Sequence, residues 1–194
     1  IKKRGVYAYE YEIIKDDKTV NAFCTPGGYI YVYTGLLKFI DNEATLAGIL
    51  GHEIAHAERR HASQRMTQVY GVQILLGVLL GNNPSQLEEI GANLLTGLAL
   101  LKNGRDQESE SDKYSFDYLD DTEYYPGAIK YFFEKIIAQE ESQPSAFETL
   151  LSTHPAPGDR ISEVEQRLQE HGTPAPTEAN LFGQRFKTFQ ATLP

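Results

Sequence analysis

The feature that most constrains this chain is the pentapeptide His-Glu-Ile-Ala-His at residues 52–56. On a helix, residues four positions apart lie on the same face, so the imidazoles of His52 and His56 are placed to bind one metal ion. Glu53 lies beside them, where a carboxylate acts as a general base toward water and is not itself a ligand. The pattern predicts a helix here and a zinc site that still requires a ligand from elsewhere in the chain.

Length and composition narrow the class of protein. A chain of 194 residues fits one domain with a substantial buried core. The net charge of -9 and the lack of a basic stripe argue against nucleic acid as a partner. Cys24 is the only cysteine, so the fold does not depend on an intrachain disulfide. Residues 1–9 lack the apolar run of a signal peptide, which leaves open a signal or anchor upstream of this sequence.

A stretch without charged side chains, residues 66–87, raises the question of a membrane. Its apolar part, residues 69–80, is too short for a spanning helix, which needs about 20 residues. A second apolar stretch at residues 90–101 follows a polar turn. We expect two helices that form a lid or wall near the cleft, and we keep a peripheral association with a membrane surface as the alternative.

Strands are predicted before residue 34. Polar and apolar residues alternate over residues 6–14 and 28–33, and residues 19–24 are extended between them. We expect these segments to form a small antiparallel sheet. In the first strand, Tyr11 and Ile13 belong to the face that we expect to pack.

Helices are predicted from residue 34 onward. One should begin at a cap formed by Asp41 or Asn42 and run through the motif to about residue 68. Others should contain residues 107–118, start near Pro126 and cover residues 160–170. The helix after the proline presents apolar residues at helical spacing, namely Ile129, Phe132, Phe133, Ile136 and Ile137.

We therefore expect an α+β, mainly helical domain over residues 1–172. Residues 173–177 (TPAPT) are typical of a linker. The tail that follows, to residue 194, is expected either to dock on the domain or to lead to a further module.

The class of zinc hydrolase depends on the missing ligand. Metzincins extend the motif with a glycine and a third histidine, but Arg59 and Ala62 occupy those two positions here. His61 is one residue out of register, and on a continuous helix it would point away from the metal. We interpret it as a surface or helix-packing histidine.

Carboxylates at residues 105–112 offer the missing ligand instead. Glu108 and Asp112 are four residues apart and share a helical face, whereas Glu110 points elsewhere. One carboxylate can bind zinc while the other accepts the free N–H of a ligating histidine, which fixes the orientation of the ring.

Four segments carry a wider pattern: NAFCTPGGYIYVYTGLL (21–37), HEIAHAERRH (52–61), RDQESESD (105–112) and STHPAPGDR (152–160). In this order they resemble the zinc metallopeptidases that include the CAAX prenyl protease and the heat-shock protease HtpX. The likeness is greatest to their soluble, periplasmic BepA-like branch. The resemblance implies a zincin-like fold of the mini-gluzincin type and one bound Zn²⁺ ion.

The resemblance also implies roles for single residues. The zinc ligands would be His52, His56 and Glu108, with Asp112 behind a ligand histidine and Glu53 as the catalytic base. A strand at the border of the cleft would pair with an extended peptide through its exposed edge. The residues of this strand are Gly28, Tyr29, Ile30, Tyr31 and Val32.

His154 and Arg160 belong to the last of the four segments, which in the family lies close to the metal. Either residue would then stabilise the oxyanion that forms when water attacks the peptide carbonyl. A second possibility, suggested by BepA-like members, is that His154 occupies the open zinc position and holds the enzyme inactive. The sequence leaves both roles open.

These patterns lead to two expected functions. The first is a zinc metalloendopeptidase that acts on unfolded or misfolded proteins, in the periplasm or cell envelope of a bacterium. The alternative is a chaperone or assembly factor that retains a zinc site held inactive by His154. In both cases Zn²⁺ is the only cofactor that we expect.

Overall fold

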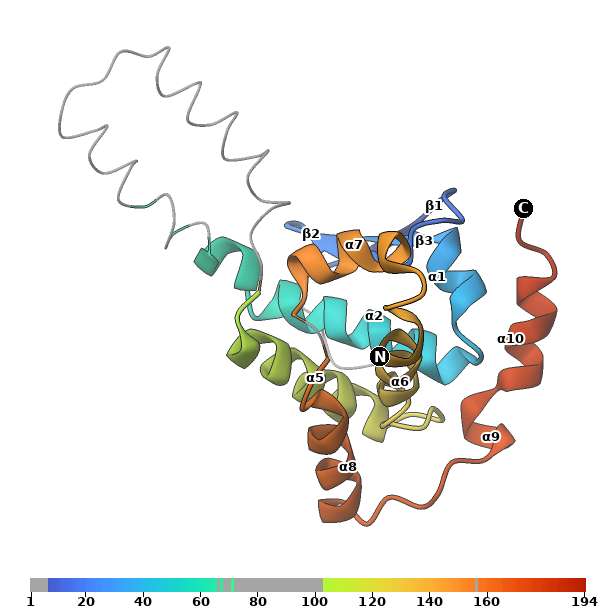
Figure 1. The fold of residues 1–194 in the computed structure, drawn as a ribbon. Helices are drawn as coiled ribbons and strands as arrows, with labels where there is room; N and C mark the ends of the chain where they lie inside the picture. The colour runs from blue at the N-terminus through green and yellow to red at the C-terminus, as the bar shows by residue number, and fades with distance from the viewer. Residues whose placement is uncertain (1–6, 66, 68–70, 72–102, 156) are drawn as a thin grey trace, which may run out of the picture.

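The computed structural model describes residues 7–65, 67, 71, 103–155 and 157–194, which form a mainly helical domain with one small sheet (Figure 1). The lid or wall expected at residues 66–101 lies outside these residues, apart from two positions. It therefore stays a prediction. Within the part that the structure describes, no helix is long and apolar enough to cross a membrane.

The sheet is mixed, not antiparallel as predicted. Its strands are β1 (Glu10–Ile14), β2 (Ala22–Thr25) and β3 (Tyr29–Tyr33), in the spatial order β1-β3-β2. β2 and β3 form an antiparallel hairpin, and β3 lies parallel to β1. The chain forms β1 and then β2, and it turns back to place β3 between these two strands. In this turn Gly27 and Gly28 have φ of 105° and 93°. Such angles favour glycine, so this turn depends on the two residues.

The faces of the sheet differ in burial. Ile30 and Val32 of β3 are buried against the helices. The register places Tyr11 and Ile13 of β1 on the same face, yet they are 54% and 56% exposed. The predicted packing of these two side chains is wrong, because β1 is an edge strand and the face that it shares with β3 is covered only toward the middle of the sheet.

The motif lies on helix α2 (Glu43–Glu58). The predicted cap is confirmed, since the side-chain oxygen of Asn42 accepts hydrogen bonds from the N–H and hydroxyl of Thr45 at 2.8 and 2.9 Å. The helix does not continue to residue 68. It is interrupted at Arg59 and Arg60, where Arg60 has φ of 58°, and helical residues resume at 61–65.

Helix α5 (Arg105–Asp120) lies beside α2 (Figure 1). Small residues allow the close approach: a Cβ atom at Gly51 would lie 2.9 Å from Oγ of Ser115. The Ser115 hydroxyl also donates a hydrogen bond to the carbonyl of Gly48 at 2.6 Å. This contact brings the carboxylates of α5 opposite the histidines of α2.

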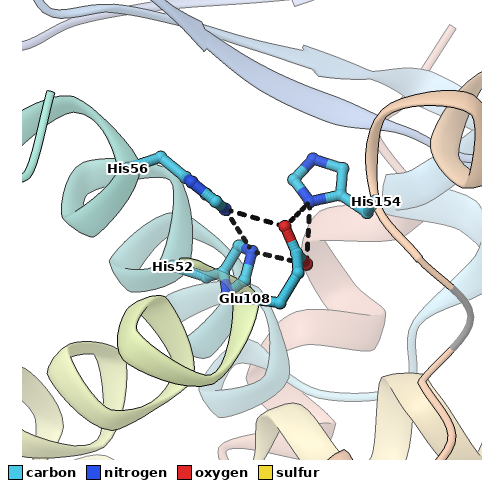
Figure 2. Close-up of side chains that lie close together, drawn as sticks. All are labelled: His52, His56, Glu108 and His154. Atoms are coloured by element: carbon cyan, nitrogen blue, oxygen red, sulfur yellow. Dashed lines mark hydrogen bonds and ion pairs between the residues drawn. The ribbon is translucent and has the colours of Figure 1, made fainter. Parts of the chain in front are cut away.

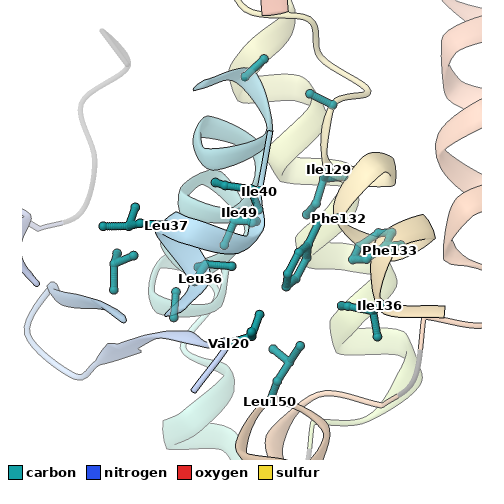
Figure 3. Packing of buried hydrophobic residues seen from close by; sticks show 14 of the residues in the cluster. Val20, Leu36, Leu37, Ile40, Ile49, Ile129, Phe132, Phe133, Ile136 and Leu150 are labelled. Carbon is teal, nitrogen blue, oxygen red and sulfur yellow. The ribbon is translucent and has the colours of Figure 1, made fainter. Parts of the chain in front are cut away.

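The core lies between the sheet, the inner faces of α2 and α5, and four further helices (Figure 3). These helices are α1 (Thr34–Phe39), α6 (Ile129–Gln139), α7 (Pro144–Thr153) and α8 (Arg160–Glu170). Helix α6 begins after a turn that contains Pro126. Its other predicted apolar positions are buried, whereas Ile137 is 51% exposed.

The C-terminal tail packs on the domain through α9 (Glu178–Leu181) and α10 (Gly183–Gln190). Phe186 is 2% exposed and belongs to the core. The side-chain amide of Gln190 donates hydrogen bonds to the carbonyls of Leu37 and Ile40 at 2.7 and 2.9 Å. These contacts hold α10 against the end of α1.

We expect Phe186→Ala to lower the free energy of unfolding by about 3–5 kcal/mol, because it removes a buried aromatic ring from the core. Phe189, on the same helix, is 38% exposed, and its replacement by alanine serves as the matched control. The control should cost less than about 1 kcal/mol. Urea unfolding of both variants measures the difference, and equal losses would contradict the packing of the tail.

Candidate metal centre

Four buried side chains direct their ligand atoms to one point, and these atoms all lie within 4.8 Å of one another (Figure 2). His52 and His56 come from α2, Glu108 from α5 and His154 from the end of α7. The Nε2 atoms of the two α2 histidines are 2.9 Å apart. Oxygens of Glu108 lie 3.5 Å from Nε2 of His52 and 3.3 Å from Nε2 of His56. Nδ1 of His154 is 3.0 and 3.1 Å from the same two oxygens.

The donor set suits a metal cation. Nδ1 of His52 faces a carboxylate oxygen of Asp112 at 2.8 Å, so in the neutral ring this nitrogen carries the proton and Nε2 keeps its lone pair. Without a metal ion, protons on the imidazoles bridge the converging nitrogens and carboxylate oxygens, and a bound metal cation can take the place of these protons. Nitrogen and oxygen ligands of this kind are those of zinc sites.

Arg160 holds the carboxylates behind the ligands. Its guanidinium donates two hydrogen bonds to Asp112, at 2.6 and 2.7 Å, and one to Glu108 at 2.9 Å. The guanidinium also stacks on the ring of Phe133, with its central carbon 4.1 Å from the ring centroid. Because these donors are taken up by carboxylates, the geometry favours a positioning role for Arg160 over the predicted contact with an oxyanion.

Burial and these contacts shift the pKa values of the site. Burial favours neutral Asp112, but the charge and hydrogen bonds of Arg160 outweigh it and lower the pKa to about 2. Burial also favours neutral His52, yet its hydrogen bonds with Asp112 and Glu108 raise the pKa to about 9. Glu108 keeps a lowered pKa despite its burial, because the charge and hydrogen bond of His154 stabilise its ionised form. The centre therefore strongly attracts positive charge.

Glu53 lies on the other side of the histidines, next to the sheet. It is 5% exposed, and burial raises the pKa of its carboxyl group. The backbone N–H of Cys24 stabilises the ionised form of this carboxyl group, which lies 3.7 Å from Nε2 of His154. The structure thus brings the predicted base and the predicted His154 together.

The predicted substrate strand is not an edge. Residues 29–33 form β3, the middle strand, and the predicted Gly28, Tyr29, Ile30, Tyr31 and Val32 have β1 and β2 on either side. The exposed-edge prediction is therefore wrong, because the chain inserts β3 between the two other strands. The strand next to Glu53 is β2.

The outer edge of β2 faces the site. The N–H of Tyr33 donates to the carbonyl of Asn21, and bonded pairs alternate along an antiparallel ladder. The backbone groups of Ala22 and Cys24 therefore point away from β3, and the N–H of Cys24 reaches Glu53. At Val20 the edge is covered, since its N–H donates to the carbonyl of Ala146 in α7.

An apolar cavity of about 30 Å³ adjoins this edge beside His52 and Glu53. Its apolar walls come from β2, α2, α6, α7 and the loop after α7. They include Ala22, Ile49, Phe132, Phe133, Ile136 and Leu150.

Two further residues at the site were not found from the sequence. Of the two roles predicted for His61, the surface position is wrong and helix packing is compatible with the structure, because the side chain is 1% exposed and its Nδ1 lies 2.8 Å from Nδ1 of His56. The prediction assumed a continuous helix, whereas the left-handed backbone at Arg60 turns His61 under His56. The amide of Asn103 lies 3.3 Å from Nδ1 of His154. Its oxygen accepts a hydrogen bond from Arg65, and no motif marks it in the sequence.

We expect Arg160→Ala, measured with a chelator present, to lower the free energy of unfolding by about 3–5 kcal/mol. The substitution leaves two buried carboxylates without their guanidinium. Arg167 lies on the same helix and pairs with the more exposed Glu163, so Arg167→Ala is the matched control, with a loss below about 1 kcal/mol. Urea unfolding of both variants checks this, and a loss no larger for Arg160→Ala would contradict the buried network.

Comparison with known proteins adds independent findings. A family model described as Peptidase family M48 matches residues 1–168. The chain is 28% identical over 183 residues to a beta-barrel assembly-enhancing protease of Yersinia pestis, covering 89% of this chain and 37% of that protein. It is 32% identical over 164 residues to the mitochondrial metalloendopeptidase OMA1 of Schizosaccharomyces pombe, with 84% and 47% covered. To the metalloprotease LoiP of Escherichia coli it is 30% identical over 163 residues, with 80% and 61% covered. The chain thus spans less than two thirds of the length of these relatives.

Proposed function

The chain belongs to peptidase family M48, and we propose that it is a zinc-dependent endopeptidase with a zincin-like fold of the mini-gluzincin type. The observation that carries the proposal is the buried convergence of His52, His56 and Glu108, with Glu53 beside them. This set supplies the ligands and the base that a metal-assisted hydrolysis requires.

Each residue has a separate role in the proposed reaction. His52, His56 and Glu108 would hold the zinc ion, and this ion would supply Lewis-acid chemistry toward a carbonyl oxygen and water. Glu53 accepts the proton from the attacking water and returns it to the leaving amine. Its raised pKa suits both steps, since a more basic carboxylate takes up a proton more readily at neutral pH. Asp112 orients His52, and Arg160 holds Asp112 in place.

We further propose that the substrate binds as an extended peptide along the outer edge of β2. The backbone groups of Ala22 and Cys24 point in this direction, and Glu53 lies at the same edge. Pairing through main-chain hydrogen bonds is largely independent of sequence. The adjoining cavity favours an apolar side chain next to the cleaved bond. Unfolded and misfolded proteins offer both features.

A role in quality control of envelope proteins accords with this substrate class. One relative is named a beta-barrel assembly-enhancing protease, and another is a mitochondrial metalloendopeptidase. We propose that this chain works in the periplasm or cell envelope of a bacterium. Its net charge of -9 gives no support to a nucleic-acid partner.

We expect Glu53→Gln to lower peptide hydrolysis at least about 100-fold, because it removes the general base, while bound zinc stays at one ion per chain. Glu108→Ala should instead lose the zinc, since it removes a ligand. Metal analysis after dialysis and cleavage of a quenched fluorescent peptide measure both properties. Glu163→Gln is the control, because the carboxylate of Glu163 contacts Ser109 and Arg167 and none of the proposed ligands. Full activity of Glu53→Gln would overturn the proposed base.

Peptides methylated on one backbone nitrogen at a time test the binding edge. We expect methylation to raise KM only at alternate positions of the peptide, because only every second residue of a paired strand directs its N–H to the partner. The unmethylated peptide of the same sequence is the reference. A uniform effect at successive positions would argue against pairing with β2.

A second candidate function rests on His154. Its ring is the fourth member of the metal cluster, and zinc sites with four protein ligands are closed, whereas catalytic sites keep one position for water. We propose that His154 restrains hydrolysis in this conformation. In such a state the protein would act as a chaperone or assembly factor until His154 withdraws. The loop after α7 carries this histidine, so the restraint can be released without moving α2 or α5.

We expect His154→Ala to raise kcat for peptide cleavage several-fold, with zinc still bound through three ligands. Stopped assays at saturating peptide, with metal content measured in parallel, give the result. A fall in kcat of about 10²-fold or more would assign His154 to stabilisation of the oxyanion instead.

A further inference from the structure

His56 has its own chain of contacts behind the metal site. Its Nδ1 lies 2.8 Å from Nδ1 of His61, and Nε2 of His61 lies 2.8 Å from a carboxylate oxygen of Glu110. Arg59 completes the chain, because its guanidinium contacts the other oxygen of Glu110 at 2.9 Å. His61 is almost fully buried, so its two ring nitrogens have no water in place of these partners.

The direction of the protons in this chain follows from Glu110. An ionised carboxylate only accepts hydrogen bonds, so Nε2 of His61 carries a proton. In a neutral ring Nδ1 of His61 is then an acceptor, and Nδ1 of His56 must donate to it. That leaves the lone pair of His56 on Nε2, the atom that faces Nε2 of His52 and Glu108. The carboxylate thus selects the tautomer of His56 that can bind a metal ion.

The left-handed backbone conformation of Arg60 allows His61 to contact His56. Its φ of 58° is uncommon for a residue other than glycine, so the surrounding structure must hold the backbone in this conformation. A continuous helix would carry His61 to another side of α2. Interruption of the helix after Glu58 returns the ring to the far side of His56 instead.

We propose that His61 and Glu110 are positioning residues that fix the tautomer and orientation of His56 for metal binding. The inference rests on the proposed zinc site but goes beyond it, since neither residue is a ligand. It also separates the two α2 histidines: Asp112 supports His52 directly, and Glu110 supports His56 through a second imidazole. Asp112 is fully buried, whereas the side chain of Glu110 is 34% exposed. The chain of contacts from His56 through His61 to Glu110 therefore reaches the surface.

Zinc affinity of the whole chain tests the proposal. We expect His61→Ala and Glu110→Ala each to weaken Zn²⁺ binding about 10- to 100-fold in competition with a chromophoric chelator. Glu163→Ala is the matched control, because Glu163 is 36% exposed and pairs with an arginine in the same way. Its affinity should equal that of the unmodified chain. Glu110 lies at the surface, so its variant keeps the test valid even if His61→Ala fails to fold.

Tautomers give a second readout that a merely structural role would not move. In the zinc-loaded chain with ¹⁵N-labelled histidine, we expect NMR to find the proton on Nδ1 of His56 and on Nε2 of His61. Glu110→Ala should change the protonation pattern of the His61 ring. Unchanged zinc affinity and unchanged tautomers in both variants would overturn the inference while the zinc site stands. Absence of zinc binding in the unmodified chain would instead overturn the proposed function.

Discussion

The close packing of α2 against α5 is the constraint on which the rest of the site depends. Gly51 has no side chain, Ser115 is small, and the Ser115 hydroxyl bonds to the carbonyl of Gly48. A larger side chain at either position would clash with the opposite helix and push α2 and α5 apart. Glu108 would then no longer reach the imidazoles, because its contacts with them span only 3.3 to 3.5 Å.

Burial of charge is the second constraint, and it explains why the site is so densely connected. Glu53, Glu108 and Asp112 bring three carboxylates into one buried region, and Arg160 contacts two of them. Unpaired buried carboxylates are costly, so each one here has a guanidinium, an imidazole or a backbone N–H as its partner. The remaining excess of negative charge favours a cation, in agreement with the raised pKa of His52.

Much of this arrangement could be predicted from the sequence, because local spacing determines it. The four-residue spacing of His52 and His56, and that of Glu108 and Asp112, depends only on helical geometry, and both pairs lie on helices as expected. The order of the strands could not be predicted, since alternation reveals a strand but not its neighbours. The contact of His61 with His56 was missed for a similar reason. Nothing in the sequence around Arg60 signals a left-handed residue, so the interruption of α2 could not be foreseen.

The two histidines of the motif differ in how their support can be perturbed. Asp112 and Arg160 are buried between α5 and α8, and they act on His52 through the hydrogen bond of its Nδ1 with Asp112. Glu110 and Arg59 lie at the surface, on the side of α2 where the helix is interrupted. His154, on its own loop, contacts Glu108 and approaches Glu53 without belonging to either support. In the proposed zinc site, metal retention and access to the metal would thus depend on different elements, and a change at His154 would alter access while the supports of both α2 histidines remain in place.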